Sequence, residues 1–182
     1  MFIKKRAHAL SGVLAIAASA AGQNTAPAPD LSADVQQQLT ALTETYKHLH
    51  RNPELSRHEE KTSAFLAEEL RKLGYSVTEH VGRYTDGSQA DGVVALMEDG
   101  PGPRLLIRTD MDALPVEEKT GLNYASTLRS TNEQRQEVGV MHACGHDLHM
   151  TVLLGVAREM AARKSQWHGT LILIGQPAEE IG

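Results

Sequence analysis

One ten-residue segment, MHACGHDLHM (141–150), concentrates side chains that can bind metal or transfer protons. It contains His142, Cys144, His146, Asp147 and His149, and Cys144 is the only cysteine of the chain. A thiolate and an imidazole two residues apart can bind one borderline-soft cation or bridge two. The positive end of a helix that begins here would help to keep the thiol ionised. The Cys144 and His146 pair is therefore a candidate metal site.

Two other roles for Cys144 fit the same segment. A lone cysteine can be a small buried hydrophobe, and a cysteine with a histidine base can be a nucleophile. The pair Glu179-Glu180, which follows an apolar segment, could on its own be two surface charges. Beside a metal, one carboxylate can bind the ion while its neighbour takes a proton from water. The two motifs together favour a metal site.

Three segments share a position in the expected architecture: RTDMDALP (108–115), HACGHD (142–147) and QPAEE (176–180). Each follows a predicted strand or begins a predicted helix. In open α/β sheets, ligands bind beyond the carboxyl ends of the strands, so these segments should meet at one edge. Three histidines lack this context and are expected at surface or packing positions: His48, His50 and His58.

The hydrophobic pattern from Leu31 onward predicts an α/β fold. Helices are expected over 31–50, 56–73 and 146–164, and strands over 75–80, 92–98, 104–110 and 169–175. Residues 115–140 are predicted to form a long polar loop, and such loops in compact domains are more often functional than idle.

Helix ends and faces follow from finer signals. Ser32 is expected to cap the first helix, and Ser56 with Glu59 to form a capping box on the second. Three apolar stripes are expected to face the core: Val35, Leu39, Leu42, Tyr46 and Leu49; Phe65, Leu66, Leu70 and Leu73; Val152, Val156 and Met160.

Composition sets outer limits. The 182 residues are 41% apolar and 23% charged with a net charge of -5, which is globular and gives no sign of nucleic-acid binding. Residues 1–20 combine a basic start, an apolar stretch and an A-x-A-like site, which predicts a secretory signal peptide. Residues 21–30 are expected to be a linker, and 31–182 the catalytic portion. The mature protein is expected to be periplasmic or secreted, without membrane attachment.

Three segments together resemble the dinuclear metallopeptidase family of carboxypeptidase G and the aminoacylases: 108–126, 141–150 and 169–180. Within that family they are similar to the amidohydrolase branch, with hippurate hydrolase, N-acyl-amino-acid amidohydrolase and indoleacetyl-amino-acid hydrolase. The resemblance implies the N-terminal part of a zinc-peptidase-like α/β/α catalytic domain. It also implies two divalent ions, whether zinc, manganese, nickel or cobalt.

The resemblance carries residue roles with it. Cys144, His146 and Glu180 fall on the branch's metal ligands, and Glu179 falls on its general base. Asp110 and Asp112 fall on a family motif whose histidine this branch lacks, so they are expected to orient neighbours. The implied activity is hydrolysis of N-acyl amino acids or short peptides through a metal-bound water. One alternative is a metal- or ligand-binding module without turnover, and a weaker one is a cysteine amidase.

The sequence departs from the branch in the loop 127–140, which is longer than usual. The family also continues beyond QPAEE with two more histidine ligands, the rest of the catalytic domain and a lid domain that often dimerises. The chain is accordingly expected to be a fragment that stops before the lid, turns over no substrate alone, and would form a homodimer only through that lid.

Overall fold

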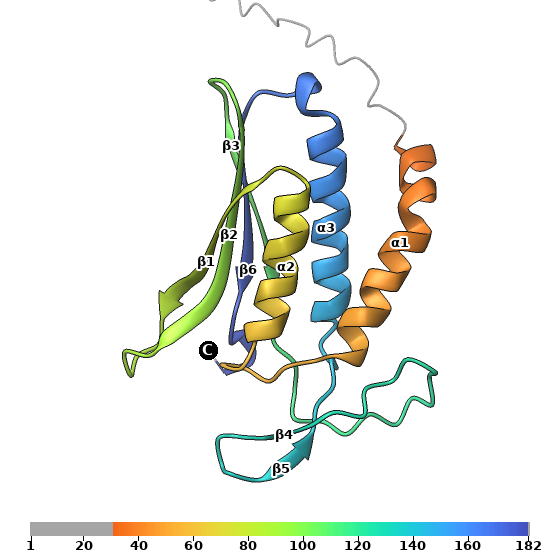
Figure 1. Cartoon of the computed structure of the whole chain (residues 1–182), viewed down its shortest axis with the longest axis vertical. Helices are drawn as coiled ribbons and strands as arrows, with labels where there is room; N and C mark the ends of the chain where they lie inside the picture. The colour runs from red at the N-terminus through yellow and green to blue at the C-terminus, as the bar shows by residue number, and fades with distance from the viewer. Residues whose placement is uncertain (1–30, 182) are drawn as a thin grey trace, which may run out of the picture. The chain divides into compact units, whose positions relative to one another are not determined.

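The computed structural model describes residues 31–181 of the chain. The predicted signal peptide and linker, residues 1–30, lie outside the described residues. Three helices lie on one side of a four-stranded sheet, the second and third directly against it and the first beyond the third (Figure 1). The α/β class is confirmed, and within residues 31–181 all three helices lie on the same side of the sheet. No helix within residues 31–181 is both long and apolar enough to cross a membrane.

The helices are α1 (Ser32–Arg51), α2 (Glu60–Lys72) and α3 (His146–Ala162), with short 3-10 turns η1 (Lys164–Gln166) and η2 (Glu179–Ile181). α2 packs on β1 and β2, α3 packs on β3, and α1 packs on α3 rather than on the sheet. The three predicted helices are confirmed to within a few residues, except that the second begins at residue 60.

The sheet contains β1 (Ser76–Arg83), β2 (Gln89–Asp99), β3 (Arg104–Asp110) and β6 (Gly169–Gln176), in the order β1-β2-β6-β3. β2 is antiparallel to both β1 and β6, whereas β3 is parallel to β6. All four strands were predicted. The loop 115–140 adds an unpredicted short hairpin of β4 (Arg129–Thr131) and β5 (Glu137–Gly139).

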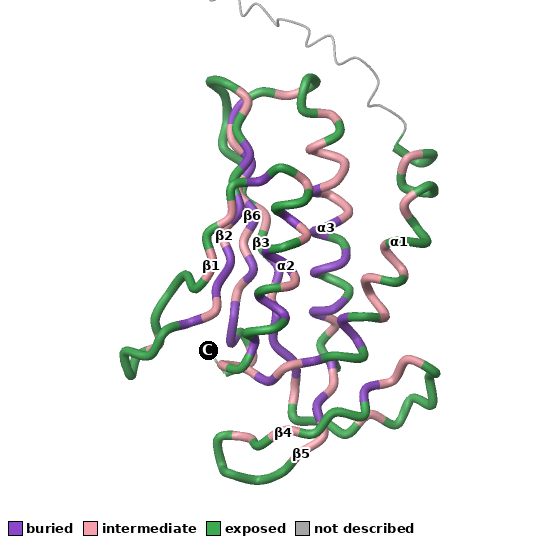
Figure 2. Tube along the Cα trace, viewed as in Figure 1, coloured by how far each residue is buried: buried purple, intermediate pink, exposed green. Residues whose placement is uncertain are grey.

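The core lies between the sheet and the helices (Figure 2). Residues on β6 alternate, so that Leu171 and Leu173 are buried beneath the helices while Ile172 and Ile174 on the other face are half-buried. Leu66 and Leu70 of α2 pack into the same core, as the predicted stripe of that helix requires.

The predicted stripes of the other two helices are confirmed only in part, since Leu49 of α1 and Met160 of α3 pack in the core but other members are exposed. On α3, Val152 is 56% exposed, and the core side consists of Met150, Leu153, Leu154 and Ala157. On α1, Val35 and Leu39 are exposed, whereas polar side chains of the same half of the helix make the contacts with the end of α3, Asp34 with Arg163 and Gln38 with Glu159. α3 is apolar nearly all round, so its periodicity alone could not identify the buried side.

The predicted caps are wrong as well. Ser32 is the first residue of α1 and not its N-cap. Ser56 and Glu59 make no capping box, because both side chains bind elsewhere. The Glu54 carboxylate satisfies the first turn of α2 instead, because it accepts hydrogen bonds from the Thr62 amide (2.7 Å) and hydroxyl (2.9 Å).

Candidate metal centre

The parallel pairing of β3 with β6 brings two of the predicted site segments together. The register places Asp110 opposite Gln176, and the Met111 amide donates to the Gln176 carbonyl at 3.0 Å. Asp112 therefore leaves the sheet at the same edge as Glu179 and Glu180. HACGHD arrives at this edge from the start of α3, which packs on β3. The expectation of convergence at one edge is confirmed.

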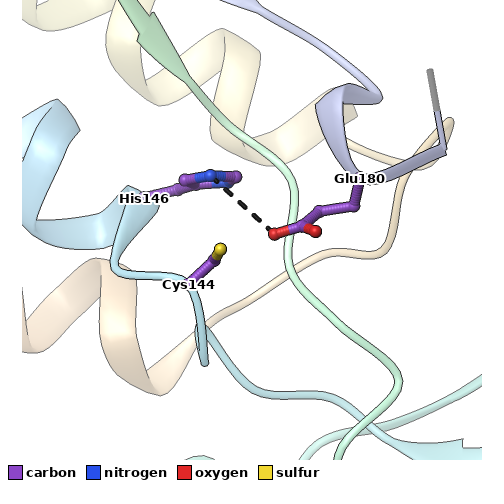
Figure 3. Close-up of side chains that lie close together, drawn as sticks. All are labelled: Cys144, His146 and Glu180. Carbon is purple, nitrogen blue, oxygen red and sulfur yellow. Dashed lines mark ion pairs between the residues drawn. The ribbon is translucent and has the colours of Figure 1, made fainter.

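Cys144, His146 and Glu180 form a compact donor group (Figure 3). One ligand atom from each lies within 4.8 Å of the others. A second group of the same kind contains Asp110, His146 and Glu179. The two groups share His146, so thiolate, imidazole and carboxylate donors are gathered in one place, a set that suits zinc and neighbouring transition metals.

His146 is buried and held in one orientation. Its Nδ1 lies 2.8 Å from the carbonyl oxygen of Asp112, which can only accept, so Nδ1 carries the proton. Nε2 therefore presents its lone pair to the opposite side. Carboxylate oxygens of Glu179 and Glu180 each lie 3.8 Å from Nε2, too far for a hydrogen bond. A cation between these atoms would be bound by all three.

Glu179 and Glu180 differ in environment although they are adjacent on η2. The Glu180 side chain is 16% exposed, and its backbone amide donates to Asp112 Oδ2 at 3.0 Å. The Glu179 side chain is 39% exposed and reaches toward solvent. The more enclosed carboxylate suits a ligand, and the more open one suits a group that exchanges protons with water.

The Cys144 thiol differs from expectation. It is exposed, and the neighbouring Glu180 carboxylate raises its pKa above the ordinary value. The residue before α3, Gly145, has a φ of 87°. The raised pKa, caused first by the hydrogen bond to the Glu180 carboxylate and then by the charge of that carboxylate, is wrong for a free nucleophile but suits a thiol that ionises against a metal. Both the buried-hydrophobe and nucleophile roles lose support.

Unpartnered buried oxygens also fit a bound cation. Oε1 of Glu180 and Oδ1 of Asp110 are buried and have no hydrogen-bond partner of good geometry among the described residues, although Oδ1 of Asp110 lies 3.2 Å from the Arg108 guanidinium. Buried acceptors without partners are rare in folded proteins. Each belongs to one of the two donor groups, so the residues present fit a divalent ion at the free Nε2 lone pair of His146, with Asp110 able to help hold a second ion beside it.

A second layer of buried carboxylates supports the donors. Asp112 is fully buried, and its Oδ2 accepts from the Ser56 hydroxyl at 2.6 Å as well as from the Glu180 amide. Glu59, also fully buried, accepts from the Ala178 amide at 2.7 Å. An orienting role was predicted for Asp112. Glu59 was missed, because its spacing from Ser56 imitates a capping box.

His50 was expected at a surface or packing position and is instead the centre of a buried ion cluster. Nδ1 donates to Asp147 Oδ2 at 2.7 Å and Nε2 to Glu118 Oε1 at 3.1 Å. Burial opposes a charge on the ring, but the two hydrogen bonds outweigh it and raise the pKa of His50. The cluster joins α1, the start of α3 and the loop after β3. Nothing in the local sequence signals this pairing.

His142 lies beneath the site and is 4% exposed. Neither ring nitrogen has a hydrogen-bond partner among the described residues, and burial lowers its pKa to about 4. His142 is therefore a neutral buried ring, and it belongs to neither donor group within residues 31–181.

A hollow of about 270 Å³ opens beside Glu180. Its apolar wall comes from the segments before α2 and after β3, and its polar rim from the tip of the β4–β5 hairpin: Leu55, Ala113, Leu114, Asn132 and Gln134. The loop that is longer than usual thus reaches the mouth of the site.

Comparisons with known proteins agree with this geometry. Residues 106–182 match Peptidase family M20/M25/M40. The chain is 42% identical to thermostable carboxypeptidase 1 of Saccharolobus solfataricus over 84% of the chain and 35% of that protein. It is 41% identical to N-acetyl-L-cysteine deacetylase of Bacillus subtilis over 75% of the chain and 29% of that protein.

A solved structure matches as well. The YXEP protein of Bacillus subtilis, described as a dinuclear metal binding peptidase from the M20 family, superimposes with a TM-score of 0.67 at 33% identity. The match covers 80% of this chain and 37% of that one. The chain spans about a third of the length of the curated relatives it matches. The predicted resemblance is confirmed: residues 106–182 match Peptidase family M20/M25/M40, and the chain is similar to the N-terminal third of amidohydrolases and carboxypeptidases.

Proposed function

We propose that this chain supplies part of the catalytic centre of a metal-dependent amidohydrolase. The observation that carries the proposal is the donor group of Cys144, His146 and Glu180, with the lone pair of His146 directed at the carboxylates. Three protein donors leave an ion with an open position, the arrangement typical of catalytic rather than structural zinc. Relatives named carboxypeptidase and deacetylase support an amide bond as the target.

Each side chain has a distinct part in this proposal. Cys144, His146 and Glu180 would hold one ion, and Asp110 would help to hold a second. Divalent ions here, whether zinc, manganese, nickel or cobalt, would polarise the scissile carbonyl and lower the pKa of water. Glu179, with its open carboxylate, would accept a proton and return it to the leaving nitrogen.

The substrates would be N-acyl amino acids or short peptides. The hollow beside Glu180 has an apolar wall suited to an acyl group or an apolar side chain, next to the proposed metal position. The net charge of -5 favours no nucleic-acid partner. The signal-like residues 1–20 support a periplasmic or secreted location without membrane attachment, and a homodimer would depend on a lid domain of the kind that the resemblance implies.

The decisive experiment compares metal content among four proteins: the unchanged chain, Cys144→Ala, Glu180→Gln and Glu179→Gln. After equilibration with zinc and dialysis, metal per chain is measured by mass spectrometry. Losing a ligand should reduce the content strongly in the first two variants, while Glu179→Gln should retain it. Equal content in all four would refute the ligand assignment.

A second measurement separates an enzyme from a binding module. Hydrolysis of benzoylglycine is followed with the metal-loaded chain, with and without a chelator. Chelator-sensitive release of glycine that Glu179→Gln lowers by roughly 10²–10⁴-fold would support the base assignment. Retained metal without release would favour the binding module for the chain alone, and activity that survives both chelation and metal loss would favour a cysteine amidase.

A further inference from the structure

We propose that Glu59 is a positioning residue that holds the turn carrying Glu179 and Glu180 in its metal-binding conformation. The inference rests on the proposed function, because it concerns the same metal site. Glu59 lies more than a hundred positions earlier in the chain and touches neither donor group directly. It acts through the backbone of Ala178, the residue immediately before Glu179.

The contact is short and lies at a strained position. The Ala178 amide donates to Glu59 Oε1 at 2.7 Å, and both residues are buried. Ala178 has a φ of 55°, in the left-handed region that residues with a Cβ atom avoid. Such a conformation persists only where the surroundings hold it, and such positions gather at functional sites. Glu59 supplies the holding contact.

Glu59 and Asp112 act on the same turn from two directions. Glu59 binds the amide of Ala178, and Asp112 Oδ2 binds the amide of Glu180. The turn is thereby fixed on each side of Glu179, so the directions of both glutamate side chains are set by carboxylates outside the turn. Without the first contact, Ala178 would relax toward negative φ and redirect the residues that follow.

Glu59 is poorly explained by stability alone. It is fully buried, has no cation partner among the described residues, and its Oε2 has no hydrogen-bond partner there. Burial is the main cause that raises its pKa to about 7, with Asp112 adding to the shift. An apolar residue would be easier to bury at this position, because a carboxylate without a cation partner loses its hydration. Nor does Glu59 cap α2, although it stands at the N-cap.

The test uses cobalt as the probe, since a Co²⁺ ion bound by a thiolate gives a charge-transfer absorption band that depends on Cys144. Cobalt affinity is compared for the unchanged chain, Glu59→Ala and Glu59→Gln. We expect about tenfold weaker binding for Glu59→Ala, equal to about 1.4 kcal/mol at 25 °C. Glu59→Gln keeps an acceptor for the Ala178 amide and should stay within about threefold of the unchanged chain.

Glu54→Ala is the matched control. Glu54 is also a carboxylate near the start of α2 that accepts a backbone hydrogen bond, from Thr62. Its loss should lower stability without altering cobalt affinity. A general loosening of the fold would instead weaken binding equally in Glu54→Ala and Glu59→Ala, and that result would overturn the inference.

The strained alanine allows a rescue experiment. Glycine adopts positive φ without a steric penalty, so Ala178→Gly should restore most of the cobalt affinity lost in Glu59→Ala and change little by itself. A merely structural Glu59 gives no reason for this rescue. Unchanged affinity in Glu59→Ala, or no rescue by Ala178→Gly, would overturn the inference.

Failure of the proposed function is distinguishable from failure of this inference. Absence of the Cys144-dependent band in the unchanged chain would refute the metal site itself. Amide hydrogen exchange of Ala178, measured without metal, then tests whether Glu59 holds the turn. We expect protection in the unchanged chain and in Glu59→Gln but faster exchange in Glu59→Ala, and equal exchange in all three would overturn the proposal.

Discussion

Replacing Glu59 by glutamine should make the protein more stable at alkaline pH than the unchanged chain. Burial raises the pKa of Glu59 from 4.5 to about 7. A group whose pKa is raised on folding contributes stability that is fully present below the unfolded pKa and is lost as pH rises through the folded pKa. The difference is about 2.5 pKa units, and at 1.36 kcal/mol per unit the unchanged chain should lose about 3 kcal/mol.

Urea unfolding followed by Trp167 fluorescence measures this loss, since Trp167 is the single tryptophan and is partly buried against the core. Glu59→Gln and the unchanged chain should unfold alike near about pH 4.5 and diverge by about 3 kcal/mol above about pH 8, in favour of the variant. Glu44→Gln, an exposed carboxylate on α1, controls for the change in net charge. A difference in unfolding free energy between Glu59→Gln and the unchanged chain that stays constant with pH would refute the raised pKa of Glu59.

Three further predictions follow from other parts of the molecule. The pKa of His50 is raised in the folded protein, so the stability that its charged ring contributes is present below about pH 6.5 and is lost as pH rises through the folded-state pKa. His50→Gln should therefore make Tm depend less on pH in this range. Gly169→Ala should destabilise the chain strongly in thermal unfolding, because φ is 113° and a Cβ atom would lie 2.1 Å from the Pro103 carbonyl oxygen. Zinc should slow alkylation of the exposed Cys144 thiol, followed by intact mass, and equal rates would contradict its role as a ligand.

Periodicity predicted the elements well where the pattern was unambiguous. β3 was placed at Arg104–Asp110, as observed, and β6 was correct to within one residue, because each is a short apolar run between turn residues. The α2 stripe was correct because polar residues occupy its other face. α3 lacked that contrast, and the choice of Val152 as a core residue was wrong.

Local capping rules failed where tertiary contacts competed for the same side chains. Ser56 and Glu59 have the spacing of a capping box, but each binds a residue that follows a strand of the sheet, Asp112 and Ala178 respectively. Local sequence patterns cannot predict these contacts, because the partners lie far away along the chain. The His50 cluster was unpredictable for the same reason, since its partners are 68 and 97 positions away.

The donor residues themselves were predictable, because MHACGHD and QPAEE carry unusual combinations of side chains. Cys144, His146 and Glu180 were expected together, and one potential ligand atom from each lies within 4.8 Å of the others. The inclusion of Asp110 in a second donor group was not expected, because it depends on how the chain leaves β3. The ionisation of Cys144 was also misjudged, since the sequence cannot show that Glu180 lies beside it.

The parallel pairing of β3 with β6 has a consequence for how a cation would bind. The candidate donors come from segments far apart in sequence. The loss of chain entropy on closing the intervening loops occurs when the strands pair during folding, before a cation would bind. A cation would therefore meet candidate ligands that are already gathered, unlike in a zinc finger, where binding and folding are one event. Circular dichroism should change little on metal addition, while Tm should rise with the logarithm of metal concentration, as expected for a ligand that selects the folded state.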